Sequence, residues 1–300
     1  MNYKSLYTIF ICALMFVVTL VVHAHPTGNM ITVGDNVLWS YINPIDDPNH
    51  KACVMLWKKG TNPKVFIQSD YAASDYILYS NKKEIYIIER RYIDERQEFK
   101  IRILKTTIDS TPTVIWDWFK DDWRIGEGGF FMLSDNHIVF GSYPLVYSLE
   151  KGKKPETYFE FDQNINRIRA VDNNLILLLN DNTCYLVEQN GKVLKSWHNL
   201  IDNTVDNAPL NRNQLFDADY RNGKLLIAYW GNRSFDSVDE NGDHKTILQQ
   251  TAPSVPHWVA FFKDELLLFS SFLIFDGSTP QPNLLMVNEE NSINQIWSKP

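Results

Sequence analysis

Six residues of this sequence could form a ligand-binding site. They are two arginines, one aspartate, one histidine and two tryptophans: Trp123, Arg124, Arg167, Asp217, His257 and Trp258. An arginine binds a carboxylate or a phosphate through two parallel hydrogen bonds, and tryptophan offers a flat apolar face. Brought together by the fold, these residues would suit a small polar or anionic ligand. The alternative is that arginines and aspartates of neighbouring segments pair with each other and only hold the fold together.

Patterns of catalytic and metal-binding residues are missing from the sequence. It contains no Gly-x-Ser-x-Gly motif, and its histidines show neither the HExxH arrangement nor another metal-binding spacing. Cys53 and Cys184 lie in apolar stretches without a neighbouring histidine, where a thiol is unreactive. We therefore predict no metal and no cofactor, and we assign no catalytic residue. A catalytic group assembled from distant segments would leave no local pattern.

The elements that must position these residues belong to a repeat. A polar turn followed by an apolar stretch recurs six times, first as Asp35-Asn36 before VLWSY and last as Lys263-Asp264 before ELLLF. The mean spacing is about 46 residues, close to the length of a propeller blade. A second polar turn follows each copy at a similar offset. Asn190-Gly191 is the clearest of these, and we predict a type I′ hairpin turn there, with positive φ at both residues.

Together the two signatures predict an all-β protein, a six-bladed β-propeller of four-stranded antiparallel blades. The blades are expected within a single domain over residues 25–300, at about 28–70, 71–118, 119–161, 162–199, 200–251 and 252–300. A closed ring protects strand edges that would otherwise pair with other chains. Four tryptophans near the ends of last strands are expected to pack between neighbouring blades: Trp116, Trp118, Trp197 and Trp297. A seven-bladed ring, using the long segment 199–214, and an irregular pair of β-sandwiches are the alternatives.

The repeated Asp-Asn-x-apolar turn and endings such as VEQNGKVLKSW resemble exported six-bladed propellers of the TolB-like and quinoprotein-like kind. The resemblance covers almost all of the chain after residue 24. It implies the fold, but such propellers include scaffolds, lyases, hydrolases and sulfotransferases, so it implies no single activity. In propellers, function usually lies at the channel mouth where the loops between blades gather. We expect the candidate residues at that mouth, together with Asp75, Arg169 and Asp219 on the channel-lining first strands.

The first 24 residues are predicted to be a signal peptide. Lys4 precedes the almost uncharged apolar run from Leu6 to Val22, and Val22-His23-Ala24 is a small-x-small cleavage pattern. A transmembrane anchor is the alternative, because the run approaches the length that spans a bilayer. The immediate cleavage site, with no basic cluster behind it, favours cleavage. We therefore expect an exported protein, periplasmic or secreted, with no membrane span after processing.

Charge and composition narrow the choice of function. The formal net charge is −7, which disfavours a nucleic-acid partner. We predict a monomeric, exported binding or interaction module for a protein partner or a small polar ligand. The alternative is a propeller-type enzyme, a hydrolase, lyase or transferase, with Arg167, Asp217 and His257 around the channel mouth. The lack of a nucleophile or metal pattern favours the binding module.

Overall fold

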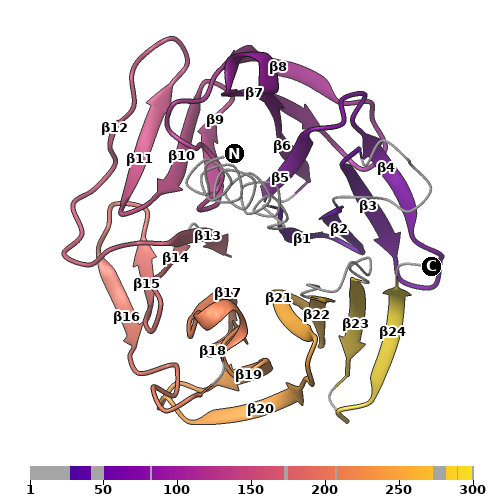
Figure 1. The fold of residues 1–300 in the computed structure, drawn as a ribbon, viewed down its shortest axis with the longest axis vertical. Coiled ribbons are helices and arrows are strands. Elements are labelled where there is room, and N and C mark those ends of the chain that lie inside the picture. Colours follow the sequence, from indigo (N-terminus) through magenta and orange to yellow (C-terminus); the bar gives the residue numbers. More distant parts are fainter. Residues whose placement is uncertain are drawn as a thin grey trace, which may run out of the picture.

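The computed structural model describes residues 28–41, 51–81, 83–171, 175–206, 208–272, 282–288 and 290–298. They form six four-stranded antiparallel sheets, arranged as blades around a central channel (Figure 1). The prediction of an all-β, six-bladed propeller is therefore confirmed. The predicted signal peptide lies outside the described residues. Within the described ranges, no helix combines the length and the apolar composition that a bilayer crossing requires.

Each blade is one uninterrupted stretch of chain. Blade 1 contains β1 (Met30–Val33), β2 (Asn36–Tyr41), β3 (Cys53–Lys58) and β4 (Lys64–Gln68). Blade 2 contains β5 (Ser74–Asn81), β6 (Glu84–Ile93), β7 (Glu98–Thr106) and β8 (Thr113–Lys120), with a 3-10 turn η1 (Asp94–Arg96) between β6 and β7. Blade 3 contains β9 (Phe130–Ser134), β10 (His137–Ser142), β11 (Leu145–Glu150) and β12 (Glu156–Thr157).

The second half of the ring repeats this order. Blade 4 contains β13 (Arg167–Val171), β14 (Leu175–Leu179), β15 (Cys184–Glu188) and β16 (Val193–Trp197). Blade 5 contains β17 (Leu215–Arg221), β18 (Lys224–Tyr229), β19 (Ser234–Val238) and β20 (His244–Gln249). Blade 6 contains β21 (Ser254–Phe262), β22 (Glu265–Phe272), β23 (Asn283–Val287) and β24 (Ile293–Ser298). The long segment before β17 adds only the short 3-10 helix η3 (Pro209–Asn211) among its described residues.

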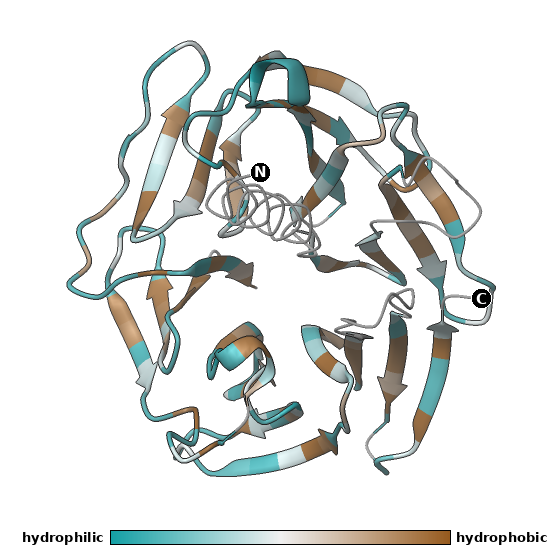
Figure 2. Ribbon diagram, in the orientation of Figure 1, coloured by the Kyte–Doolittle hydropathy of each residue, from teal (hydrophilic) through white to brown (hydrophobic). Residues whose placement is uncertain are grey.

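Strand order within every blade follows the chain, so no described strand crosses into a neighbouring blade. The first strand of each blade faces the channel, and the fourth lies on the outside of the ring (Figure 1). Blades 6 and 1 therefore share no strand among the described residues. Figure 2 shows apolar residues concentrated in the strands and polar residues in the turns and loops around the rim.

Apolar packing fills the seams between blades. Six clusters of buried residues lie in the six blade-to-blade seams of the described ring. The cluster between blades 6 and 1 is rich in aromatic rings, including Trp39, Trp57 and Trp258. Cys53 and Cys184 are free, buried thiols in different clusters. Burial raises the pKa of the Cys184 thiol, which agrees with its expected role as a small apolar residue.

One turn prediction was wrong in its type. Gly191 has φ +87°, but Asn190 does not have positive φ, and the Gly191 N–H donates to the Glu188 carbonyl. This is a three-residue hairpin loop with glycine in the left-handed region rather than a type I′ turn. Two consecutive residues with positive φ occur instead at Asn222 (+49°) and Gly223 (+83°), between β17 and β18.

Three of the four last-strand tryptophans lie between blades as predicted. Trp116 donates from Nε1 to the Asp135 carbonyl of blade 3, and Trp197 donates to the Asp239 carbonyl of blade 5. Trp297 packs on Trp39 of blade 1, with ring centroids 5.5 Å apart.

Trp118 is the exception, because the register between β7 and β8 shifts. Ile101 pairs with Phe119 and Ile103 pairs with Trp116, so β8 has one extra residue between these two pairs. A bulge of this kind exchanges the faces of the residues around it. Phe119 therefore joins Trp116 in the core cluster. Trp118 lies instead beneath the guanidinium groups of Arg91 and Arg102, at 4.4 and 4.8 Å from the ring centroid.

Candidate functional site in the central channel

The channel-facing charges come from alternate residues of neighbouring first strands. Alternate residues of a strand share one face, so Arg167 and Arg169 of β13 project together, as do Asp217 and Asp219 of β17. Arg169 Nη1 lies 2.9 Å from Asp217 Oδ2, and its Nε lies 3.5 Å from Asp219 Oδ1. Arg167 is farther from its partner, with Nη1 3.8 Å from Asp217 Oδ1. Arginine and aspartate of neighbouring blades thus pair in the channel.

The same carboxylates also bind the backbone of blade 6. Asp217 Oδ2 accepts a hydrogen bond from the Val259 N–H (3.2 Å), and Asp219 Oδ2 accepts one from the Phe261 N–H (2.8 Å). Arg169 Nη1 donates to the Val259 carbonyl (2.8 Å). No described strand pairs with β21 on this side, so these side chains satisfy backbone groups that a further strand would otherwise bind.

Burial shifts the ionisation of this group. Burial lowers the pKa of Arg167, and the carboxylate of Asp217 offsets part of that effect. Burial acts in the same direction on Arg169, but the carboxylates of Asp219 and Asp217 outweigh it and raise its pKa. Burial raises the pKa of Asp219 against the opposing charge of Arg169. Arg169 is the well-compensated cation of the group, and Arg167 is the weakly compensated one.

A second ion group lies on the opposite wall of the channel. Arg90 of β6 binds Asp75 of β5 (Nη2 to Oδ2, 2.9 Å) and Glu127 of the loop before β9 (Nη1 to Oε1, 2.7 Å). Glu127 also lines a small void of about 20 Å³ with Arg167, Asp217 and other residues. A void of that size holds about one water molecule. The channel is therefore narrow at this level.

The channel widens toward the turns that join first and second strands. A cavity of about 680 Å³ is lined there by residues from all six blades. Its charged lining residues are Arg169, Asp219, Arg221 and Lys263. We call this the turn-end cavity. The opposite end, where the loops between blades lie, is the loop end, and it is the end at which the sequence led us to expect the site.

Arg221 is the most distinctive group of the turn-end cavity. Its guanidinium donates to two main-chain carbonyls of blade 6, those of Phe261 (3.0 Å) and Lys263 (2.7 Å). No carboxylate of the described residues lies within ion-pair distance of it. Lys263, in contrast, pairs with Asp35 at 2.7 Å. Arg221 was not among the candidates, although it opens one of the repeated turns; a charged residue at the channel end of a first strand was the available signal.

The structure brings some of the six sequence candidates together and separates others. Arg167 and Asp217 line the narrow part of the channel. His257 is buried among rings, 4.8 Å from Phe216 and 5.2 Å from Trp230 between centroids. The guanidinium of Arg167 lies 5.3 Å from the same Phe216 ring, so Phe216 separates it from the histidine. Trp258 is 1% exposed and stacks on Phe269 at 4.3 Å.

The other two candidates lie on the loop before β9. Trp123 is 40% exposed and meets Tyr147 edge-on. Arg124 is exposed, has φ +54° and lies 3.8 Å from Glu127. The loop itself is organised by Asp121, whose Oδ1 accepts hydrogen bonds from the N–H groups of Trp123 and Ile125. Neither candidate lines the turn-end cavity.

Metal binding gains no geometric basis in the part of the chain that the structure describes. There, no three side chains of His, Cys, Asp or Glu gather as metal ligands would. The segment Asp239–Asp243 is a turn in which Asp239 Oδ1 accepts hydrogen bonds from the N–H groups of Asn241 and Asp243. The chemistry available in the channel is thus the recognition of charged and polar groups.

Comparison with known proteins identifies no family for this chain. No family model and no curated protein sequence matches it. Solved structures similar to it include a catalytically inactive virginiamycin B lyase from Staphylococcus aureus with quinupristin, at 11% identity and TM-score 0.48, covering 89% of this chain and 82% of that one. A nidogen/laminin complex gives 12% identity, TM-score 0.49 and coverages of 90% and 91%. The Pan2 WD40 domain of Neurospora crassa gives 8% identity and a TM-score of 0.47, covering 93% of this chain and 90% of that one. Identity this low gives no basis for transferring a ligand or a reaction.

Proposed function

We propose that this protein is an exported binding module that holds a small polar anion in the turn-end cavity. The observation that carries the proposal is Arg221, a cation on the cavity wall that contacts two main-chain carbonyls and the Phe261 ring and has no carboxylate partner among the described residues. Arg169 and Lys263 lie on the same wall, but each already has carboxylate partners, Asp217 and Asp219 for Arg169 and Asp35 for Lys263. A carboxylate or phosphate entering the cavity would find a guanidinium ready to donate charge-assisted hydrogen bonds.

The size and lining of the cavity also support a small ligand. At about 680 Å³ it falls in the range of small-molecule sites. Besides the charged groups, its wall includes the hydroxyl and amide side chains of Thr32, Ser80, Asn81 and Gln189. Such groups fix the orientation of a polar molecule. The enzyme alternative has less support, because Asp217 and Asp219 are committed to Arg169 and to the backbone of β21.

The test is a titration of the purified protein with citrate, galacturonate and inorganic phosphate, followed by calorimetry and by the thermal unfolding midpoint. Galactose serves as the uncharged match to galacturonate. We expect at least one anion to bind, and Arg221→Gln to weaken that binding by about tenfold or more, as loss of a charge-assisted contact does. Lys263→Gln is the second cavity variant, in case Arg221→Gln perturbs the fold.

Arg233→Gln is the matched control. Arg233 also comes from blade 5 and donates to a blade 6 carbonyl, that of Ser254 at 2.7 Å, but it does so at the loop end. Binding should be unchanged in this variant. Equal weakening in both arginine variants, or no binding of any anion by the folded protein, would contradict the proposal. A mass of the exported protein that still includes residues 1–24 would contradict cleavage after Ala24 and leave the binding proposal untouched.

A further inference from the structure

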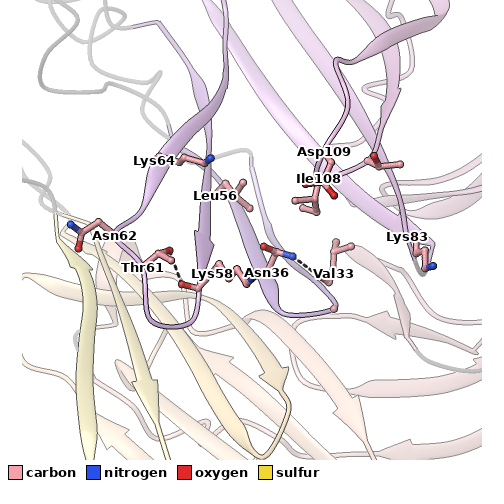
Figure 3. A pocket seen from close by; sticks show the side chains of 12 residues that line it. Val33, Asn36, Leu56, Lys58, Thr61, Asn62, Lys64, Lys83, Ile108 and Asp109 are labelled. Carbon is pink, nitrogen blue, oxygen red and sulfur yellow. Dashed lines mark hydrogen bonds between the residues drawn. The ribbon is translucent and has the colours of Figure 1, made fainter.

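A second hollow lies on the same end of the ring, in the seam between blades 1 and 2. It has a volume of about 670 Å³ and is lined by the β1–β2 turn, β3 and β4 of blade 1 and by two turns of blade 2. Figure 3 shows its two walls, with Leu56, Lys58 and Lys64 on one side and Ile108 and Asp109 on the other. We call it the seam groove.

The floor of the seam groove is apolar. Val33 and Leu56 are 5% and 6% exposed and belong to the core cluster between blades 1 and 2, against which Ile108 packs. The groove is thus a place where the edge of a hydrophobic core reaches the surface. Apolar side chains of a partner would gain the usual free energy of burial there.

The rim of the seam groove is cationic. Lys58, Lys64 and Lys83 are exposed lining residues, and Asp109 is the one lining carboxylate. Among the described residues none of these lysines forms an ion pair. Lysines just outside the groove do, since Lys59 pairs with Glu265 at 2.7 Å and Lys263 with Asp35 at 2.7 Å. The rim therefore gathers three lysines against Asp109 and, near Lys58, the carboxylate of Asp35, on a chain whose net charge is −7.

We propose that the seam groove binds an acidic peptide segment in which apolar and acidic residues alternate. In an extended peptide, alternate side chains point to opposite sides. One set would lie on Val33, Leu56 and Ile108, while the carboxylates of the other set would be reached by the long side chains of the rim lysines. Thr61 and Asn62 add hydrogen-bonding groups for the peptide backbone.

The observations favour a peptide over an acidic sugar chain. A sugar ring commonly packs on a flat aromatic side chain, and the lining of the seam groove contains none. The turn-end cavity is a separate site, although Gly34 of the β1–β2 turn borders both. The inference therefore does not depend on the small-anion proposal.

The experiment is a fluorescence anisotropy titration of the full-length protein with a short fluorescein-labelled peptide of alternating Glu and Leu. The test variant carries Lys58→Gln, Lys64→Gln and Lys83→Gln. Its match carries Lys154→Gln, Lys224→Gln and Lys245→Gln, three exposed lysines of blades 3 and 5 with the same total charge change. We expect the groove variant to bind about tenfold or more weakly and the matched variant to bind like the parent protein.

The apolar part of the proposal has its own variant. Ile108→Ser should weaken binding of the Glu/Leu peptide several-fold and leave the weak binding of a Glu/Gln peptide unchanged. Equal weakening by the two lysine triple variants would reduce the interaction to net charge and overturn the site. Failure of the Glu/Leu peptide to bind would also overturn it. If a sulfated oligosaccharide binds the groove more tightly than the peptide, and the groove lysines account for that preference, the peptide assignment is wrong.

Discussion

The two seams on either side of blade 6 both contain a buried apolar cluster, but they differ in the contacts that are added to it. On the blade 5 side, charged side chains of β17 bind the backbone of β21 at Val259 and Phe261. On the blade 1 side, aromatic rings meet, with Trp297 5.5 Å from Trp39 and 5.1 Å from Tyr41. The seam between blades 5 and 6 adds buried charged contacts to its apolar cluster, whereas the cluster between blades 6 and 1 is enlarged by aromatic rings.

The difference follows from the way the chain runs. Blades 5 and 6 are joined by a short link between Gln249 and Ser254, so their strands need a register, which hydrogen bonds supply. Blades 6 and 1 share no described strand and stand far apart in the sequence. Burial of aromatic surface is strong and tolerates small displacements, and it therefore suits a seam that must close last.

The largest effect on stability is expected from disrupting the aromatic cluster between blades 6 and 1. Trp258→Ala removes a ring that is 1% exposed and leaves a cavity between blades 6 and 1. We expect the free energy of unfolding to fall by about 3–5 kcal/mol, as measured by urea titration. Trp123→Ala, at 40% exposure, is the control and should change it by less than about 1 kcal/mol. Equal losses in the two variants would mean that the seam contributes no special stability.

Breaking the charged contacts between blades 5 and 6 should lower the free energy of unfolding somewhat less. Asp217→Asn keeps an acceptor for the Val259 N–H but removes the charge that faces Arg169. We expect a loss of about 2–4 kcal/mol in the same titration, because the buried guanidinium loses a counter-ion. Asp206→Asn, an exposed position, should have almost no effect. A neutral outcome for Asp217→Asn would show that Asp219 alone compensates Arg169.

Asp121 is a buried carboxylate like Asp217, but it has no arginine paired with it among the described residues. Asp121 is 6% exposed, its Oδ2 has no hydrogen-bond partner among the described residues, and burial raises its pKa to about 6. The folded state thus holds the proton more tightly than the unfolded state, so stability rises as the pH falls from about 6 toward 4.

Asp121→Asn should remove that pH dependence. It should stabilise the protein at pH 7 by about 1–3 kcal/mol, with the gain shrinking as the pH falls and disappearing below about pH 3, where the wild-type carboxyl is protonated in both states. Unfolding midpoints measured across this pH range check both the sign and the window. A variant that is less stable than wild type at pH 7 would show that the ionised carboxylate is needed to hold the Trp123 and Ile125 N–H groups.

The smallest effect on stability is expected from the exposed ion pair between blades 1 and 6. Lys59→Ala removes the ion pair with Glu265 that bridges blades 1 and 6. Since the lysine is 48% exposed, the loss should be about 0–1 kcal/mol and should disappear in about 1 M salt. A large loss that persists in salt would mean that this pair, and not the rings beneath it, closes the ring.

The fold was predictable because its information is local and repeated. Each blade has its polar turns at the same places, and the apolar stretches between them are too short for helices. Even so, the Asn190-Gly191 turn adopted another type, because only Gly191 needed the left-handed region. Trp118 left the seam because a bulge arose from the pairing of β7 with β8, which neither strand shows alone.

The candidate site was predictable only in part. The sequence placed Arg167 and Asp217 on first strands, and the structure puts both on the channel wall. It could not show that the wide cavity lies at the turn end, because channel width depends on how six separate blades tilt and fill the centre. Nor could the sequence show that His257 is buried, because its burial depends on Phe216 and Trp230 of blade 5, which pack on its ring.

The absence of a shared strand among the described blades has a consequence for behaviour at high protein concentration. Blades 6 and 1 meet like the two halves of a dimer interface. The rest of the ring links the two faces and so sets their effective concentration for each other. When heat or denaturant opens that interface, each face can instead take the complementary face of another molecule. Such a contact between unlike faces does not close on itself. Head-to-tail association through Trp39, Trp258 and Trp297 is therefore the form of aggregation to which this architecture is most exposed.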